Sequence, residues 1–242
     1  MMNQHLGLLA ARSRINHHHP ASGLQLKSIQ IDPNVAPGPN PLSIILPSVA
    51  VGDLIVPIFL YLGTQPTWTA VANDSIGNVY AQDTVQYGGG GACDIYGFKS
   101  IATVAGTNVT VNADFVGGHS VGGTLVVYQF SGANSTINWF DIVYTSLKSG
   151  SLSSNTYSVQ SGSSVLIAGT SYVFNGSSQV ISAAAPQPAT KDTSGVAFSN
   201  SLDFETWHYL SNTVASGQVT TFSIVPTSQW RFTNIIGVVN PA

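Results

Sequence analysis

Short apolar runs, separated by Gly, Ser and Asn clusters, recur from Val51 to the end of the chain. Apolar and polar residues alternate from Val109 to Asp114, a pattern typical of a strand with one face in a core and one in water. TLVVYQF (Thr124–Phe130) and VLIAGTSYVF (Val165–Phe174) are apolar on both faces, which is typical of central strands. No segment of helical length carries an apolar stripe at i, i+3 and i+4. The pattern therefore predicts an all-β protein, folded as an antiparallel β-sandwich.

The chain before these strands has a different character. Five prolines between Pro33 and Pro47 exclude a long helix there and favour extended or turn backbone. We expect residues 1–40 to form an extended N-terminal arm, of which 1–25 are the most arm-like, and residues 41–242 to form a single β-sandwich domain.

A faint internal repeat relates the two halves of the chain at a constant spacing of 110 residues, which is the spacing from Gly52 to Gly162. Each of these glycines precedes a strand-like run, and TVAGTNVTV from Thr103 matches TVASGQVTT from Thr213. LVVYQFSG from Leu125 aligns with IIGVVNPA from Ile235 at the same spacing of 110. Two tandem domains of about 100 residues each, or one sandwich with pseudo-symmetric halves, would explain the repeat. We favour the single sandwich, because the strand-like sequence continues between the halves without a linker.

Ordered motifs along the chain resemble a known type of module. VGDLIV, DSIGNVY, VAGTNVTV, VVYQFSG and SGSSVLIAGT follow one another between Val51 and Thr170. Together they resemble a β-sandwich module, about 200 residues long, that is common in phage virion and bacterial surface proteins. The resemblance covers about Lys27 to Val239 and implies a jelly-roll-like fold in virion or cell-surface structure. It implies no catalytic residues, and the arm lies outside it.

The low content of charged residues adds to this picture. Charged residues make up 7% of the 242 residues, and no apolar run approaches the roughly 18 residues of a membrane span. The surface must therefore consist mainly of neutral polar residues, which suits virus particles and secreted proteins. The start of the chain lacks the features of a signal peptide, so we expect export by lysis or within a particle.

The function that we expect is that of a virion structural protein, not an enzyme. It would be a phage capsid decoration or cement protein on the capsid surface, bound through its arm to the major capsid protein or other virion subunits, and a homo-oligomer, most simply a trimer. We expect no cofactor, no membrane and no nucleic-acid partner, since the arm has only three bases. The expected partner-binding residues of the arm are Leu6, Leu8, Leu9, Arg12, Arg14, His17, His18 and His19.

Two other functions remain open. A carbohydrate-binding or adhesion module of a tail fibre or cell surface would use exposed aromatic residues on a glycan, and a polysaccharide hydrolase would need two converging carboxylates. The residues that could form a glycan platform are Trp68, Trp139, Trp207 and Trp230.

Polar clusters elsewhere are candidates for metal or catalytic sites. DSIGNVYAQD (Asp74–Asp83) supplies oxygens for calcium, but its residue types favour the bend of a hairpin. In DFETWHYL, strand alternation places Asp203 and Glu205 on one face and His208 on the other, which argues against a shared metal. The three arm histidines could hold a transition metal, but a solvated arm or hydrogen bonds at a partner's surface explain them more simply, and we expect no metal site. Cys93 is expected to be a buried, inert thiol.

Overall fold

The computed structural model confirms an all-β, antiparallel sandwich. It describes residues 23–32, 41–62, 68–87, 94–116, 122–146, 150–153, 157–173, 180–184, 189–197, 202–211, 215–218, 221–225 and 230–242. Every regular element in these ranges is a strand. These ranges contain no helix with the length and hydropathy needed to cross a bilayer.

The first half of the chain forms one two-layered sandwich. Its five-stranded inner sheet has the order β1 (Gln25–Asp32), β8 (Gly122–Ser131), β3 (Leu54–Leu62), β6 (Asp94–Ile101) and β5 (Ala81–Gln86). Its three-stranded outer sheet has the order β2 (Leu42–Val49), β7 (Gly106–Phe115) and β4 (Ala70–Asp74). The nested pairing of β1 with β8, β2 with β7 and β3 with β6 is that of a rolled-up antiparallel ribbon, a jelly roll.

The second half repeats this arrangement, so the chain forms two sandwiches, whereas the sequence pattern favours one. Its inner sheet has the order β9 (Ala133–Ser146), β18 (Trp230–Pro241), β12 (Ser164–Val173), β15 (Leu202–Leu210) and β14 (Thr190–Ala197). Its outer layer consists of β10 (Gly150–Ser153), β17 (Thr221–Val225) and β13 (Val180–Ala184), together with the pair β11 (Tyr157–Val159) and β16 (Ala215–Gln218). The pairing is again nested, from β9 with β18 inwards to β12 with β15.

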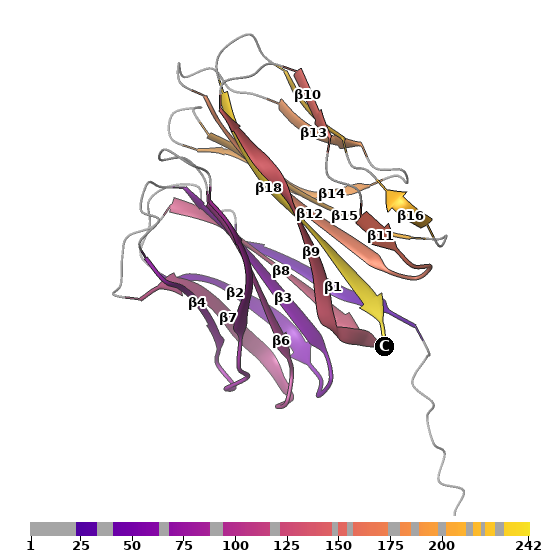
Figure 1. The fold of residues 1–242 in the computed structure, drawn as a ribbon. Coiled ribbons are helices and arrows are strands. Elements are labelled where there is room, and N and C mark those ends of the chain that lie inside the picture. Colours follow the sequence, from indigo (N-terminus) through magenta and orange to yellow (C-terminus); the bar gives the residue numbers. More distant parts are fainter. Residues whose placement is uncertain are drawn as a thin grey trace, which may run out of the picture.

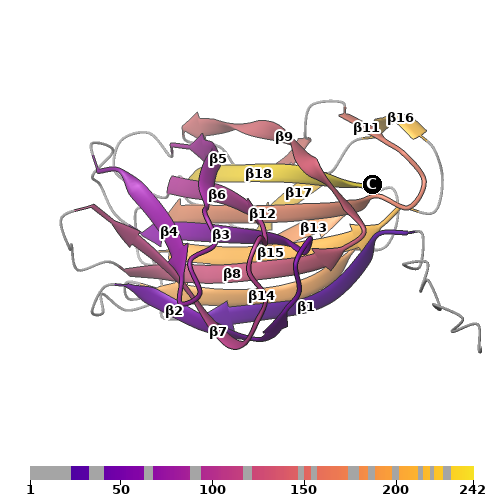
Figure 2. The same ribbon diagram turned by 90° about the horizontal axis from the view of Figure 1, so that it is seen from below.

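The two sandwiches pack against each other through their inner sheets (Figures 1 and 2). Side chains of β3 alternate between two cores: Leu54, Val56 and Ile58 face the second sandwich, whereas Ile55 and Phe59 face the outer sheet. The apolar layer between the inner sheets is called the shared core here. Its buried members are Leu24, Leu54, Val56, Ile58, Leu60, Ile95, Val126, Tyr128, Phe130, Ile137, Leu166, Ala168, Phe204, Ile235 and Val239.

The prediction of central strands is thus confirmed for β8 and β12, which are paired on both edges and have buried residues on both faces. The alternating segment from Val109 to Asp114 lies in β7 of an outer sheet, with Val109 and Val111 in the core, as predicted. Strands with two apolar faces form the inner sheets because each inner sheet is covered on both sides.

Both halves contain the same turn before their central strand. The Asp53 amide donates to the Ala50 carbonyl, and the Ser163 amide donates to the Gln160 carbonyl, each over 3.1 Å. The glycine in each turn has a positive φ, +90° at Gly52 and +84° at Gly162, a conformation that glycine adopts without strain. These turns start β3 and β12 at the spacing of 110 that the sequence predicts.

The last strands of the two halves, β8 and β18, are related by a spacing that is one position shorter than the 110 of the turns. They are called the closing strands here. Phe130 pairs with Leu54 at the start of β3, whereas Val239 pairs with Ser164 at the start of β12, so β8 and β18 correspond at 109. An alignment at 110 would place Val126, which faces the shared core, against Ile236, which faces the opposite core. A shift by one position reverses the face of every side chain in a strand, which is why the spacing matters.

Part of the predicted arm belongs to the sandwich. Residues 25–32 form β1, the edge strand of the first inner sheet, because Leu24 is buried in the shared core and β1 pairs along β8. Lys27 lies at a bulge in this pairing and forms an ion pair with Asp53, with 2.6 Å between nitrogen and oxygen. Lys27 is therefore committed to the body of the protein.

A glycine substitution tests the close packing of Trp139 on the neighbouring strand of the second inner sheet. A Cβ atom at Gly237 in β18 would lie 2.7 Å from a ring carbon of Trp139, so we expect Gly237→Ala to lower the free energy of unfolding by about 1–3 kcal/mol. The control is Gly23→Ala, whose Cβ would meet nothing within 4 Å. Urea denaturation measures both variants, and equal stability would contradict this account of the packing.

Candidate functional site

Two aspartates stand at equivalent bulges, one in each inner sheet. In the β5–β6 pair, Asp83 is left out of the register between Gln82 and Thr84. In the β14–β15 pair, Asp192 is left out between Lys191 and Thr193. The spacing from Asp83 to Asp192 is the same as that of the closing strands. A bulge redirects a side chain locally, and each of these carboxylates accepts a hydrogen bond from the other sandwich.

Asp83 of the first sandwich receives its bond from Trp139 of the second. The indole Nε1 of Trp139 donates to Asp83 Oδ2 over 2.7 Å. Lys99, on the neighbouring strand β6, places its Nζ 2.8 Å from Asp83 Oδ1. The carboxylate thus joins a partly buried indole to a lysine whose side chain is 26% exposed.

Asp192 of the second sandwich makes the reciprocal contact. The hydroxyl of Tyr128, from β8 of the first sandwich, donates to Asp192 Oδ2 over 2.6 Å. Burial, and then the charge of Asp192, raise the pKa of Tyr128 well above its ordinary value, so the phenol stays protonated and donates. His208 Nδ1 lies 2.6 Å from Asp192 Oδ1. A chain Tyr128–Asp192–His208 therefore crosses the boundary between the sandwiches.

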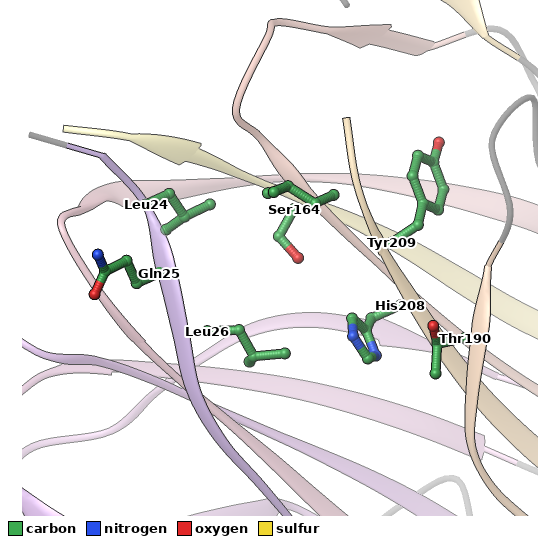
Figure 3. A pocket seen from close by; sticks show the side chains of 8 residues that line it. Leu24, Gln25, Leu26, Ser164, Thr190, His208 and Tyr209 are labelled. Carbon is green, nitrogen blue, oxygen red and sulfur yellow. The ribbon is translucent and has the colours of Figure 1, made fainter. Parts of the chain in front are cut away.

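This chain ends at an open hollow of about 460 Å³ between the two sandwiches (Figure 3). The side chain of Asp192 is 2% exposed and that of His208 is 20% exposed, so the imidazole, not the carboxylate, faces the hollow. The hollow is lined by Leu24, Gln25, Leu26, Ser164, Thr190, His208, Tyr209 and Leu210.

The lining has two chemically different sides. Leu26 of β1, and Leu24 just before this strand, project towards the second sandwich, whereas Gln25 points the other way (Figure 3). Ser164 and His208 face the leucines from β12 and β15. Because Asp192 holds Nδ1, the Nε2 atom of His208 lies on the far edge of the ring, where it can exchange a hydrogen bond with a bound group.

The structure shows the side-chain directions of two of the three candidate metal ligands in DFETWHYL. Glu205 lies 2.8 Å from Lys191 Nζ, on the face of β15 that carries Trp207, whereas His208 is on the face that bonds Asp192. The prediction that Glu205 and His208 point in opposite directions is confirmed. The side chain of Asp203 lies outside the described residues. Within the described ranges, no three His, Cys, Asp or Glu side chains are close enough to share a metal ion.

The DSIGNVYAQD segment is a bend, but it does not close the predicted hairpin. β4 pairs with β7 and β5 pairs with β6, so the segment carries the chain from the outer to the inner sheet. Asp74 Oδ1 accepts the amides of Ile76, Gly77 and Asn78, and its Oδ2 accepts the side chains of Asn78 and Tyr80. Both oxygens of the Asp74 carboxylate thus accept hydrogen bonds from groups of the turn itself. These bonds explain why the turn contains an aspartate, without a bound calcium ion.

The predicted tryptophan platform is only partly within the described side chains. Trp207 is 3% exposed in the core between the two layers of the second sandwich, and Trp68 packs against Phe115 and Tyr61. Trp139 is held between the sandwiches by Asp83. The side chain of Trp230 lies outside the described part of the chain.

The side chains predicted to bind a partner in the arm, and Cys93, also lie outside the described residues. The partner-binding residues predicted there are Leu6, Leu8, Leu9, Arg12, Arg14, His17, His18 and His19.

Sequence reasoning misses the residues that form the two carboxylate contacts. From its surroundings in the chain, Asp192 resembles a turn residue with backbone partners, whereas it lies at a bulge and bonds two side chains. The repeat contains the signal, since a spacing of 109 aligns Asp83 with Asp192 and Lys99 with His208. A search at 110 alone does not align them.

Comparison with known proteins gives no relative for this chain: no family model, curated protein or solved structure matches it. What the site can do is therefore argued from its own geometry.

A pair of matched substitutions tests the carboxylate contacts. Asp192→Ala removes the acceptor of the buried Tyr128 hydroxyl and of His208, and we expect a loss of about 1–3 kcal/mol in the free energy of unfolding. Asp83→Ala is the equivalent change, and we expect a smaller loss because the Asp83 side chain is 19% exposed and water can replace it. Chemical denaturation of both variants measures the difference. A larger loss for Asp83→Ala would refute the assigned roles.

Proposed function

We propose that this protein is a virion structural protein. It would be a decoration or cement protein that binds a capsid through its N-terminal arm. The observation that carries the proposal is the anchoring of the chain just after the arm. Leu24 is 8% exposed in the shared core, and the next residues form β1. A segment attached in this way would hold the whole body to whatever the arm binds.

The anchor is reinforced by polar contacts around Asp53. This buried carboxylate accepts Lys27 Nζ over 2.6 Å, Gln129 Nε2 over 2.7 Å and the amide of Ala50 over 2.9 Å. Asp53 thus ties β1, β8 and the turn before β3 together. Pulling on the arm would have to break these contacts as well as the pairing of β1, which supports a mechanical role for this end of the protein.

The described chain begins and ends at the same corner of the molecule. The amide of Ala242 donates to the carbonyl of Gly132 over 2.9 Å, and a Cβ atom at Gly132 would lie 2.5 Å from the carbonyl oxygen of Gly23. In the proposed assembly this corner faces the capsid and the two sandwiches project from it.

The proposed partner is the major capsid protein or another virion subunit. Arg12 and Arg14 would pair with acidic groups of that partner, and Leu6, Leu8 and Leu9 would fill apolar pockets on it. Few surface charges would keep neighbouring copies from repelling each other at high density on a particle.

Deletion of residues 1–22 tests the arm directly. We expect the shortened protein to lose co-sedimentation with empty capsids of the virus that encodes it, while its melting temperature stays within about 2 °C of the full chain. Leu24 and β1 must remain, because their removal would open the shared core. Arg12→Glu combined with Arg14→Glu is the milder version, and we expect weaker binding that depends less on salt. Undiminished binding of the deletion variant would refute the proposal.

We also propose that the protein assembles as a trimer. Light scattering of the full chain should then give three times the 25.3 kDa of one chain. A mass of one chain at all accessible concentrations would contradict this part of the proposal.

A further inference from the structure

The hollow between β1 and β15 has the features of a small-ligand site. Its volume of about 460 Å³ lies within the roughly 300–1,000 Å³ of pockets that bind small molecules. Leucines of the first sandwich form one wall, and the second sandwich supplies a polar wall of Ser164, Thr190 and His208, flanked by Tyr209 and Leu210. The walls come from different sandwiches, and the carboxylate chain fixes them relative to each other.

The polar wall is oriented before any ligand arrives. Asp192, itself held by Tyr128, accepts the hydrogen bond at Nδ1 of His208 and so fixes the plane of the imidazole. The Tyr128 and His208 rings lie edge to face, with 6.4 Å between their centroids, which restricts the imidazole further. A group bound at Nε2 would therefore cost little additional ordering of the protein.

The chemistry of the lining excludes two kinds of ligand. A charged ligand would find no Lys, Arg, Asp or Glu among the described residues that line the hollow. A purely apolar ligand would cover His208, Ser164 and Thr190 without giving them hydrogen bonds, which is costly. The ligand that fits both walls is uncharged, has an apolar face and carries hydroxyl groups at its edge.

We propose that this hollow binds a neutral saccharide ring. The C–H face of the ring would pack on Leu24 and Leu26, and its hydroxyls would bond His208, Ser164 and Thr190. A hydroxyl both donates and accepts, so it can form a hydrogen bond with Nε2 in either direction. This site uses no residue of 1–22 and does not depend on the capsid role.

The internal repeat shows that the polar wall is not a by-product of the fold. Positions equivalent to Ser164 and Thr190 are occupied by Leu54 and Ala81 in the first sandwich. Leu26 corresponds to Ile137, which is 5% exposed, so the equivalent position in the second sandwich is buried. Only one of the two equivalent places therefore combines the imidazole with two hydroxyls.

The test uses the full chain and defined probes. Saturation-transfer NMR is recorded with the methyl glycosides of glucose, galactose, mannose and N-acetylglucosamine, with glucuronate as a charged control and benzene as an apolar one. We expect transfer from at least one neutral glycoside, together with a shift of the His208 ring signals in labelled protein. Transfer confined to glucuronate or benzene, or absent from all the probes, would overturn the proposal.

Matched variants then place the binding in the hollow. Thr190 is exposed on the edge strand β14, so Thr190→Arg should fill the hollow without disturbing a core and should weaken binding at least about tenfold. Ala81→Arg makes the same change at the equivalent exposed position of β5 and should leave binding unchanged. Binding that survives Thr190→Arg, or that is lost equally with Ala81→Arg, would show that the saccharide binds elsewhere.

Discussion

The contact between the two inner sheets is the constraint on which the rest of the structure depends. Each inner sheet is apolar on both faces, so neither sandwich could expose its inner face to water without a large unfavourable free energy. Burying a single large aliphatic side chain stabilises by about 1.5–3 kcal/mol, and the shared core contains many of them. The two jelly rolls therefore form one four-layered body, and β1, at the edge of that body, is fixed because Leu24 enters the same core.

Apolar packing alone would allow the sheets to slide, and the two carboxylate contacts prevent this. Trp139 reaches Asp83 in one direction and Tyr128 reaches Asp192 in the other, so each sandwich donates one directional bond to the other. The contacts are equivalent in position but not in chemistry, since Lys99 completes one and His208 completes the other. This difference places an imidazole at the hollow, where the equivalent position in the first sandwich holds a lysine, and it shows how a duplicated fold can acquire a distinct site.

How far the sequence predicts this structure depends on which interactions are local. Alternation in Val109–Asp114 and the two-sided apolar runs correctly distinguish outer from inner strands, because burial acts on each strand separately. The residue types around Asp74 predict the bend, but not the sheets that it joins, because pairing is set by distant strands. The bulge aspartates are not predictable from their surroundings in sequence: Tyr128 and Asp192 are 64 residues apart and are brought together by the packing of one sandwich on the other.

The position of β1 bears on how one chain could combine assembly with recognition. The anchor of the arm and one wall of the hollow are the same strand, since Leu24 and Leu26 line the hollow while Lys27 ties β1 to Asp53. The bulge at Lys27 turns the basic side chain towards Asp53 while its neighbour Leu26 faces the second sandwich. A saccharide held against β1 would therefore stabilise the strand from which the arm departs. In a particle that binds through the arm, the hollow would lie close to the attachment corner, so the proposed ligand and the proposed partner would act on one edge of the molecule.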